Sequence, residues 1–194
     1  MDTKEILSIP CVIVVIISTS LITTAIMPHT LLAQTTPANL LTYQNSTFGI
    51  KIQYPSNWEK QENGTRQDTQ TDIVTFLSPV INSRANLDVS IDDISGEKGI
   101  SLTQYANQNI ADLNQSLPDA KLIASNTNNV VIAGLPAYRM VYTSADGSTI
   151  LKTMEIGAMK GDKVYILTYE AAMQEYAKYL PVIQRMIDSF QITK

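Results

Sequence analysis

A long run without charge divides this chain into two unlike parts. No Asp, Glu, Lys or Arg occurs between Glu5 and Lys51, and within that run the 19 residues 9–27 are almost entirely apolar or hydroxylated. A helix with no polar stripe cannot present a soluble face to water, so residues 9–27 are not expected to form a surface helix of a globular domain. A folded core must therefore come from the residues that follow.

Two interpretations of residues 1–33 stay open. A cation at Lys4, the apolar run and a small residue at Ala33 follow the order of a secretory signal peptide, which predicts cleavage after Ala33. The run is also close to the ~20 residues that span a bilayer and longer than a usual signal-peptide core of about 7–15 residues. Residues 9–27 could therefore be an uncleaved membrane anchor. Both interpretations predict that the rest of the chain lies outside the cytoplasm, either secreted or anchored.

The residue inventory excludes several classes of chemistry. The single Cys and the single His, Cys11 and His29, both lie in the N-terminal segment. The rest of the chain therefore has no imidazole base, no thiol nucleophile, no His or Cys ligand for zinc and no disulfide. A net charge of -4 without a basic run argues against nucleic-acid binding. We expect a protein that is not an enzyme and needs no cofactor.

Alternating polarity after residue 44 predicts a β-rich domain. In residues 48–55, Phe48, Ile50 and Ile52 share one face and polar residues share the other, which is typical of a half-buried strand. Asp146-Gly147 is a strong hairpin signal. Residues 34–44 are uncharged and read as a linker. Further strands are expected at residues 73–77, 86–94, 130–132, 137–143, 149–159 and 164–169.

Two segments change to helical spacing, residues 101–117 and 174–189. Ser101 and Gln104 form a capping box at the start of the first. Pro181 lies inside the second, and the sequence predicts that its regular part starts near Lys178. The strand connections are mostly short, which favours antiparallel pairing. The predicted fold class is α+β, an antiparallel sheet of six or seven strands flanked by helices in an α/β/α sandwich.

Four segments in this order resemble the PsbP-like family, named for an extrinsic subunit of the photosynthetic oxygen-evolving complex. They are residues 48–58, 133–138, 163–169 and 179–190. The resemblance covers about residues 43–193, so the domain is expected at residues 45–194. It implies an antiparallel sheet flanked by helices, usually exported and often beside a membrane. It does not imply one activity. Photosynthetic members bind a membrane complex and help to retain calcium and chloride, but nothing in this sequence indicates a photosystem, and the resemblance is to a non-photosynthetic member.

Few residues are candidates for a site. Asp92 and Asp93 could share a calcium ion if the end of their strand bends, because calcium prefers oxygen ligands. Asp88, Glu155 and Glu170 could converge as catalytic carboxylates. Three sequons fit an exported protein, but their number is close to what chance predicts; their glycosylation candidates are Asn45, Asn63 and Asn114.

The predicted function is an exported, non-catalytic binding or assembly module at or near the outer face of a membrane. Its partner would be a protein or membrane complex at the cell surface. The alternative is a calcium-dependent protein or carboxylate-based enzyme on the same fold.

Overall fold

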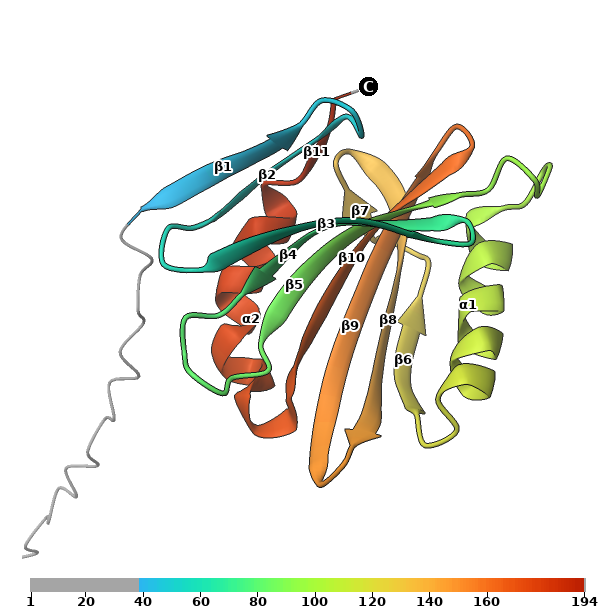
Figure 1. Ribbon diagram of the computed structural model, residues 1–194. Coiled ribbons are helices and arrows are strands. Elements are labelled where there is room, and N and C mark those ends of the chain that lie inside the picture. Colours follow the sequence, from blue (N-terminus) through green and yellow to red (C-terminus); the bar gives the residue numbers. More distant parts are fainter. Residues whose placement is uncertain (1–38, 194) are drawn as a thin grey trace, which may run out of the picture. The chain divides into compact units, whose positions relative to one another are not determined.

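The structure is a computed structural model that describes residues 39–193 (Figure 1). The elements in chain order are β1 (Leu40–Asn45), β2 (Ile50–Pro55), β3 (Glu59–Gln67), β4 (Gln70–Leu77), β5 (Asn86–Asp93), α1 (Leu102–Ser116), β6 (Lys121–Asn126), β7 (Val131–Ile132), β8 (Leu135–Asp146), β9 (Thr149–Lys160), β10 (Lys163–Ala172), α2 (Met173–Asp188) and β11 (Gln191–Ile192). No helix among residues 39–193 has the length and apolar character needed to cross a membrane.

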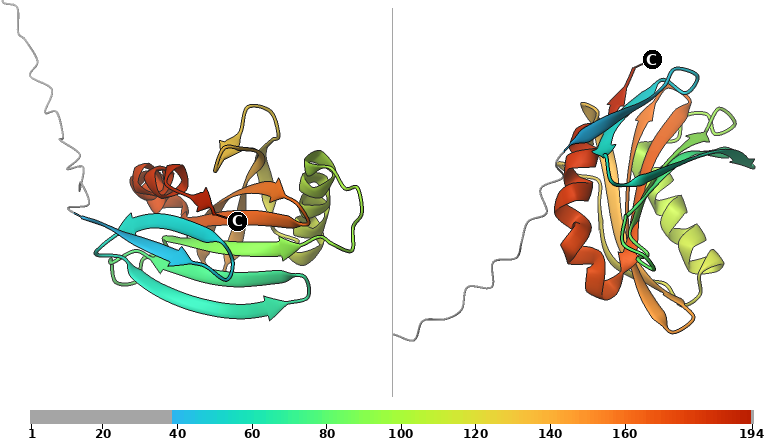
Figure 2. Two further views of the ribbon diagram at one scale, coloured as in Figure 1. Left: turned by 90° about the horizontal axis from the view of Figure 1, so that it is seen from above. Right: turned by 60° about the vertical axis from the view of Figure 1, so that its left-hand side comes forward.

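An eight-stranded antiparallel sheet forms the centre of the described part. Seven of its strands lie side by side in the order β3-β4-β5-β10-β9-β8-β6, and the short strand β7 pairs with β8. A second sheet has three strands in the order β1-β2-β11. Helices α1 and α2 lie on either side of the large sheet (Figures 1 and 2). The predicted α+β class, with an antiparallel sheet between helices, is confirmed.

The main core lies between the large sheet and a cover made by α2 and the small sheet. Alternate residues of β10 enter it, among them Tyr165 and Leu167. Helix α2 adds Tyr176, Ile183 and Met186, and all five side chains are buried. The apolar face of the helix, which repeats every 3.6 residues, thus packs against the apolar face of the strand, which repeats every 2 residues.

A smaller core lies under α1 on the opposite face of the sheet. Val164 and Ile166 of β10 alternate with the residues that enter the main core and pack here with Tyr105 of α1 and Tyr138 of β8. Tyr138 fits because its partner on β9 is Gly157: a Cβ added there would lie 2.5 Å from Tyr138 Cε1. The sequence signal for this close approach is a glycine inside a strand.

The structure extends α2 beyond the prediction. The helix runs from Met173 to Asp188 with Pro181 inside it, so its regular part does not begin near Lys178. Proline removes one helical hydrogen bond and crowds the preceding turn, which costs about 3 kcal/mol in an exposed helix. Buried side chains on both sides of Pro181, such as Tyr179 and Ile183, hold the helix on the sheet. Helix α1 begins with the predicted capping box between Ser101 and Gln104.

Several strands were not predicted. Residues 40–45 form β1 where the sequence suggested the end of a linker. Residues 59–67 form β3, and every residue of that strand is exposed. Strand β6 is exposed along its whole length as well, and β11 has two residues. Exposed or very short strands lack the apolar alternation from which strands are predicted.

Candidate functional site

The face of the large sheet on the α1 side carries a group of partly buried carboxyl groups. Asp88 on β5 and Glu155 on β9 are both paired with Thr168 of β10, so the three residues form a row across the sheet. Asp88 and Glu155 are thus two strand spacings apart, about 9.5 Å between backbones. Glu170 lies two residues from Thr168 along β10 and shares its face. The structure therefore brings Asp88, Glu155 and Glu170 onto one surface, as the sequence alone could not show.

Each of these carboxyl groups accepts a hydrogen bond from a hydroxyl group on the next strand. Thr75 Oγ1 donates to Asp88 Oδ1 at 2.5 Å, and Thr153 Oγ1 donates to Glu170 Oε2 at 3.4 Å. Burial raises the pKa of Asp88 and of Glu170 above its usual value, and the threonine hydrogen bond opposes the rise in each case. These are groups that give up their protons less readily than exposed acids.

Helix α1 closes over Glu155. Tyr138 Oη donates to Glu155 Oε1 at 2.5 Å, and Asn109 Nδ2 of the helix reaches the same oxygen at 3.2 Å and Tyr138 Oη at 3.1 Å. Burial raises the pKa of Glu155, and both hydrogen bonds oppose the rise. Burial, with the charge of Glu155 beside it, also raises the pKa of Tyr142 to about 12. This cluster fixes the helix to the sheet through polar contacts as well as through the smaller core.

The predicted calcium residues are engaged separately. Asp92 Oδ2 accepts a hydrogen bond from Tyr105 Oη at 2.8 Å, while Asp93 Oδ1 accepts one from the Ser95 backbone N–H at 3.0 Å. Both lie within regular strand β5, where neighbouring side chains point to opposite faces. Within residues 39–193, no three His, Cys, Asp or Glu side chains are grouped so that they could hold a metal ion. The calcium site stays a prediction, and this geometry does not favour it.

The glycosylation candidates differ in their surroundings. Asn45 is partly buried, and its Nδ2 donates to Tyr43 Oη at 3.1 Å. Asn63 is exposed on β3 and donates to Thr75 Oγ1 at 2.8 Å. Asn114 lies in helix α1. Glycosylation stays a prediction at all three. The predicted cleavage position, Ala33, lies outside the described residues.

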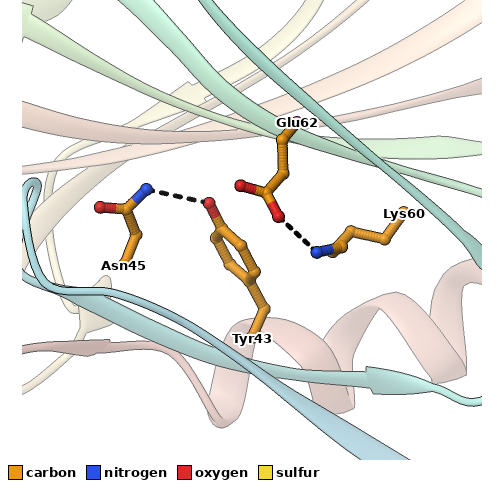
Figure 3. A network of polar contacts seen from close by, with 4 residues as sticks. All are labelled: Tyr43, Asn45, Lys60 and Glu62. Atoms are coloured by element: carbon orange, nitrogen blue, oxygen red, sulfur yellow. Dashed lines mark hydrogen bonds and ion pairs between the residues drawn. The ribbon is translucent and has the colours of Figure 1, made fainter.

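Asn45 also belongs to a contact between the two sheets (Figure 3). Tyr43 of β1 lies beneath Lys60 of β3, whose Nζ is 5.1 Å from the ring centroid. Lys60 in turn forms an ion pair with Glu62 on the same strand. Both charged side chains are well exposed, so the pair itself contributes little to stability. We interpret this network as a link between the sheets and not as a site of chemistry.

The surface is hollowed beside α2. Two hollows of about 470 and 690 Å³ share Val131 and Ile187, and we refer to them together as the α2 groove. The first lies between Gln184 of the helix and residues 126–131, over Met154 and Ile156 of β9. The second continues between residues 131–134 and residues 190–193. Val131 is 63% exposed, although it is a large apolar residue.

One cation that lines the groove has no ion-pair partner within residues 39–193. Arg139 of β8 is exposed in the first hollow, and the two ion pairs found among residues 39–193, Lys60–Glu62 and Arg84–Asp146, do not include it. Its polar neighbours in that hollow are the uncharged amides of Asn126, Asn128, Asn129 and Gln184. The first hollow thus combines an apolar floor with one positive charge and several amide groups, while the second hollow is lined by one acidic residue, Asp188.

Sequence reasoning missed the α2 groove. Its residues come from β7, β8, β9, β11, α2, the end of β6 and the loops beside them, so no local motif marks it. The one available signal was an arginine at position 139, on the face of a strand whose other residues, Ala137 and Val141, are apolar. A charge at such a position is unusual.

Comparisons with known proteins agree with this fold. The sequence model of a family described as "PsbP-like protein" matches residues 6–192. Among solved structures, the chain is similar to the cyanobacterial PsbP (CyanoP) of Synechocystis sp. PCC 6803, with a TM-score of 0.61 and 18% identity over 80% of this chain and 93% of that one. No match was found among curated protein sequences.

Two further solved structures have no evident connection with photosynthesis in their descriptions. LpqN of Mycobacterium tuberculosis, described as involved in cell envelope biogenesis, has a TM-score of 0.55 and 11% identity over 80% of this chain and 91% of that one. The Ran-binding protein Mog1p of Saccharomyces cerevisiae has a TM-score of 0.52 and 10% identity over 80% of this chain and 96% of that one. Identities this low show a shared fold alone. The family match, in contrast, spans nearly the whole sequence and confirms the resemblance, and the chain belongs to the PsbP-like protein family.

Proposed function

We propose that this chain is an exported, non-catalytic binding or assembly module that holds a protein partner at or near the outer face of a membrane. The observation that carries the proposal is the α2 groove, which exposes an apolar surface at Val131 beside Arg139, a cation with no ion-pair partner in the described part of the chain. Apolar surface rimmed by polar groups is typical of interaction sites. Arginine is enriched in such interfaces.

The similar structures support a protein partner. Mog1p is described as a Ran-binding protein, and LpqN is described as involved in cell envelope biogenesis. Neither description names a reaction. A fold found both in a Ran-binding protein and in a protein involved in cell envelope biogenesis suits a module whose function depends on its surface.

The proposed location rests on the uncharged N-terminal segment. A cysteine placed at the exposed position Ile150 is expected to react with a membrane-impermeant maleimide in intact cells, in a background where Cys11 is replaced by Ser. Labelling that requires lysis of the cells would contradict export. Mass spectrometry of the recovered protein then separates the two forms, since cleavage leaves Gln34 at the amino terminus and an anchor leaves the leader attached.

Photo-crosslinking tests the partner. A photoreactive amino acid at Val131 in the full-length chain is expected to capture a specific protein in native membranes. The matched control places the same group at Gln115, which is exposed on α1 away from the groove. Equal capture from both positions, or none from Val131, would count against the groove as the binding surface.

The alternative function is favoured by one observation, the three carboxyl groups with raised pKa values on the α1 side of the sheet. Calorimetry with calcium and the full-length chain addresses its calcium-dependent form. The binding module predicts no heat of binding. Micromolar binding that disappears in the Asp92→Asn/Asp93→Asn double variant would establish the alternative instead.

A further inference from the structure

Strands β7 and β11 line the second hollow of the α2 groove, and each has an edge without a partner strand among residues 39–193. Strand β11 is at the edge of the three-stranded sheet, and β7 pairs only with β8 among the described strands. Residues 131–134 lie on one side of the hollow and residues 190–193 on the other. An unpaired strand edge offers backbone N–H and C=O groups to any extended chain that reaches it.

The register of β11 shows which backbone groups are free. Thr193 N donates to Gly49 O at 2.7 Å, and Ile192 is paired with Ile50 of β2. Hydrogen-bonded and non-hydrogen-bonded pairs alternate in an antiparallel ladder. The N–H and C=O of Ile192 therefore point away from β2, toward the side of β11 that has no partner strand in the described part of the chain.

The first hollow, which continues from this edge, is lined by a cation that would favour an acidic side chain of a bound segment. Arg139 lies opposite Ile156 of β9, so its guanidinium stands beside the apolar floor formed by Met154 and Ile156. On the same face of β9, Lys152 is two residues from Met154, and its Nζ lies 4.4 Å from the ring centroid of Tyr176. Neither cation has an ion-pair partner among residues 39–193. Of these two cations only Arg139 lines the groove, and it lies in the first hollow, whereas Asp188 lines the second. A segment that reaches the first hollow thus meets one positive charge on a chain that is negative as a whole.

We propose that the α2 groove binds an extended polypeptide segment of a partner protein, which adds a strand to the free edge of β11 and places an acidic side chain on Arg139. This inference rests on the proposed function and specifies the chemistry of the partner. Main-chain hydrogen bonds to Ile192 hold the segment, while Met154, Ile156 and Ile187 accept an aliphatic side chain. This is the division found in strand addition, where backbone contacts give affinity and side-chain pockets give specificity.

The test uses three pools of fluorescein-labelled ten-residue peptides. Their sequences alternate Val, Ile or Leu with Ser or Thr, and the central residue is Glu, Gln or Lys. Fluorescence anisotropy with the full-length chain is expected to show that the Glu pool binds about ten-fold or more tighter than the Gln pool, because hydrogen bonds to charged groups are the stronger ones. The Lys pool is expected to bind most weakly.

Two matched variants identify the cation. Arg139→Gln is expected to abolish the preference for Glu over Gln without a change in Tm, since the Arg139 side chain is exposed and forms no hydrogen bond or ion pair with residues 39–193. Arg185→Gln removes the same charge from the exposed surface of α2 outside the groove and is expected to retain the preference. Equal affinity for the three pools, or no binding by any of them, overturns the proposal.

Hydrogen exchange tests the strand addition. The Glu pool is expected to slow amide exchange at Ile192 and within residues 131–134, and unchanged exchange there would overturn the backbone part of the proposal. Sodium dodecanoate serves as a second probe. If it binds through Arg139 and the Glu pool does not, the occupant is a lipid-like carboxylate and not a polypeptide. Capture of a protein at Val131 without any peptide preference would leave the proposed function standing and refute only this inference.

Discussion

The close approach of Tyr138 to Gly157 makes a sharp prediction about stability. Tyr138 is only 1% exposed, and a Cβ at position 157 would lie 2.5 Å from its Cε1, 2.8 Å from its Cζ and 2.9 Å from its hydroxyl oxygen. All three distances are far inside van der Waals contact. Gly157 does not have a positive φ, so the backbone itself would accept alanine. The Gly157→Ala substitution therefore tests the clash alone.

The magnitude follows from opposing effects. Alanine inside a strand is favoured over glycine by about 0.5–1 kcal/mol. Forcing an extra methyl group into a filled core costs about 1–3 kcal/mol. Displacement of the Tyr138 ring would also weaken its hydrogen bonds with Glu155 and Asn109, each worth about 1 kcal/mol. We expect the free energy of unfolding of Gly157→Ala to fall by about 1–3 kcal/mol.

Urea denaturation measures this change. Fluorescence of Trp58, the single tryptophan, reports the main core, because its ring is buried and packs edge-on against Tyr179 at 6.0 Å between centroids. Near-UV circular dichroism reports all buried tyrosines, including Tyr138. The matched control is Gly96→Ala, since a Cβ at that exposed position would meet nothing within 4 Å. The control is expected to be as stable as the wild type or slightly more stable.

A Gly157→Ala variant at least as stable as the wild type would refute this reasoning. A double variant separates the clash from other causes. Tyr138→Ala removes the ring and should destabilise the chain by about 3–5 kcal/mol. In that background Gly157→Ala is expected to cost nothing further, because its Cβ no longer meets the ring. An equal cost in both backgrounds would show that Tyr138 is not responsible.

Three other predictions concern charge, capping and binding. Burial raises the pKa of Glu155 above its usual 4.5. Between the unfolded-state and folded-state pKa values, the folded chain therefore holds a proton that the unfolded chain releases. The free energy of unfolding is expected to fall as the pH rises through the folded-state pKa. Glu155→Gln retains the acceptor oxygen for Tyr138, and thermal melts should show it more stable than the wild type at pH 7 but not at pH 4. Ser101→Ala removes the side-chain cap of α1, and urea denaturation should show a loss of about 1 kcal/mol, whereas Ser95→Ala in the preceding loop should show little change. The anisotropy titration of Arg139→Gln should show the lost preference for glutamate described above.

Amphipathic patterns made most of the fold predictable. Strands with one buried face, such as β2 and β5, alternate in polarity and were located from the sequence. The capping box and the Asp146-Gly147 turn were also found, because they depend on residues close together in the chain. Strands β3 and β6 were missed because they are exposed on both faces and are held by pairing with β4 and β8. Such pairing leaves no periodic signal in the strand itself.

The candidate site was predictable only in part. The sequence named Asp88, Glu155 and Glu170 as groups that could converge, and the register of β5, β10 and β9 places them on one face. It did not indicate that each carboxyl group would accept a hydrogen bond from a hydroxyl group on a neighbouring strand. The α2 groove could not be predicted at all, because the packing of the strands and α2 brings its parts together from segments that are far apart in the sequence.

The sequence by itself determined which chemistry is available, since the absence of imidazole and thiol after residue 29 follows from composition alone. It also determined the alternation and helical spacing that bury a core, because these are properties of neighbouring residues. Only the tertiary structure decided that, among residues 39–193, Arg139 has no counterion and β11 and β7 each have an unpaired edge beside one hollow. Charge pairing and strand edges depend on which distant segments become neighbours, and that is settled when the sheets and α2 pack together.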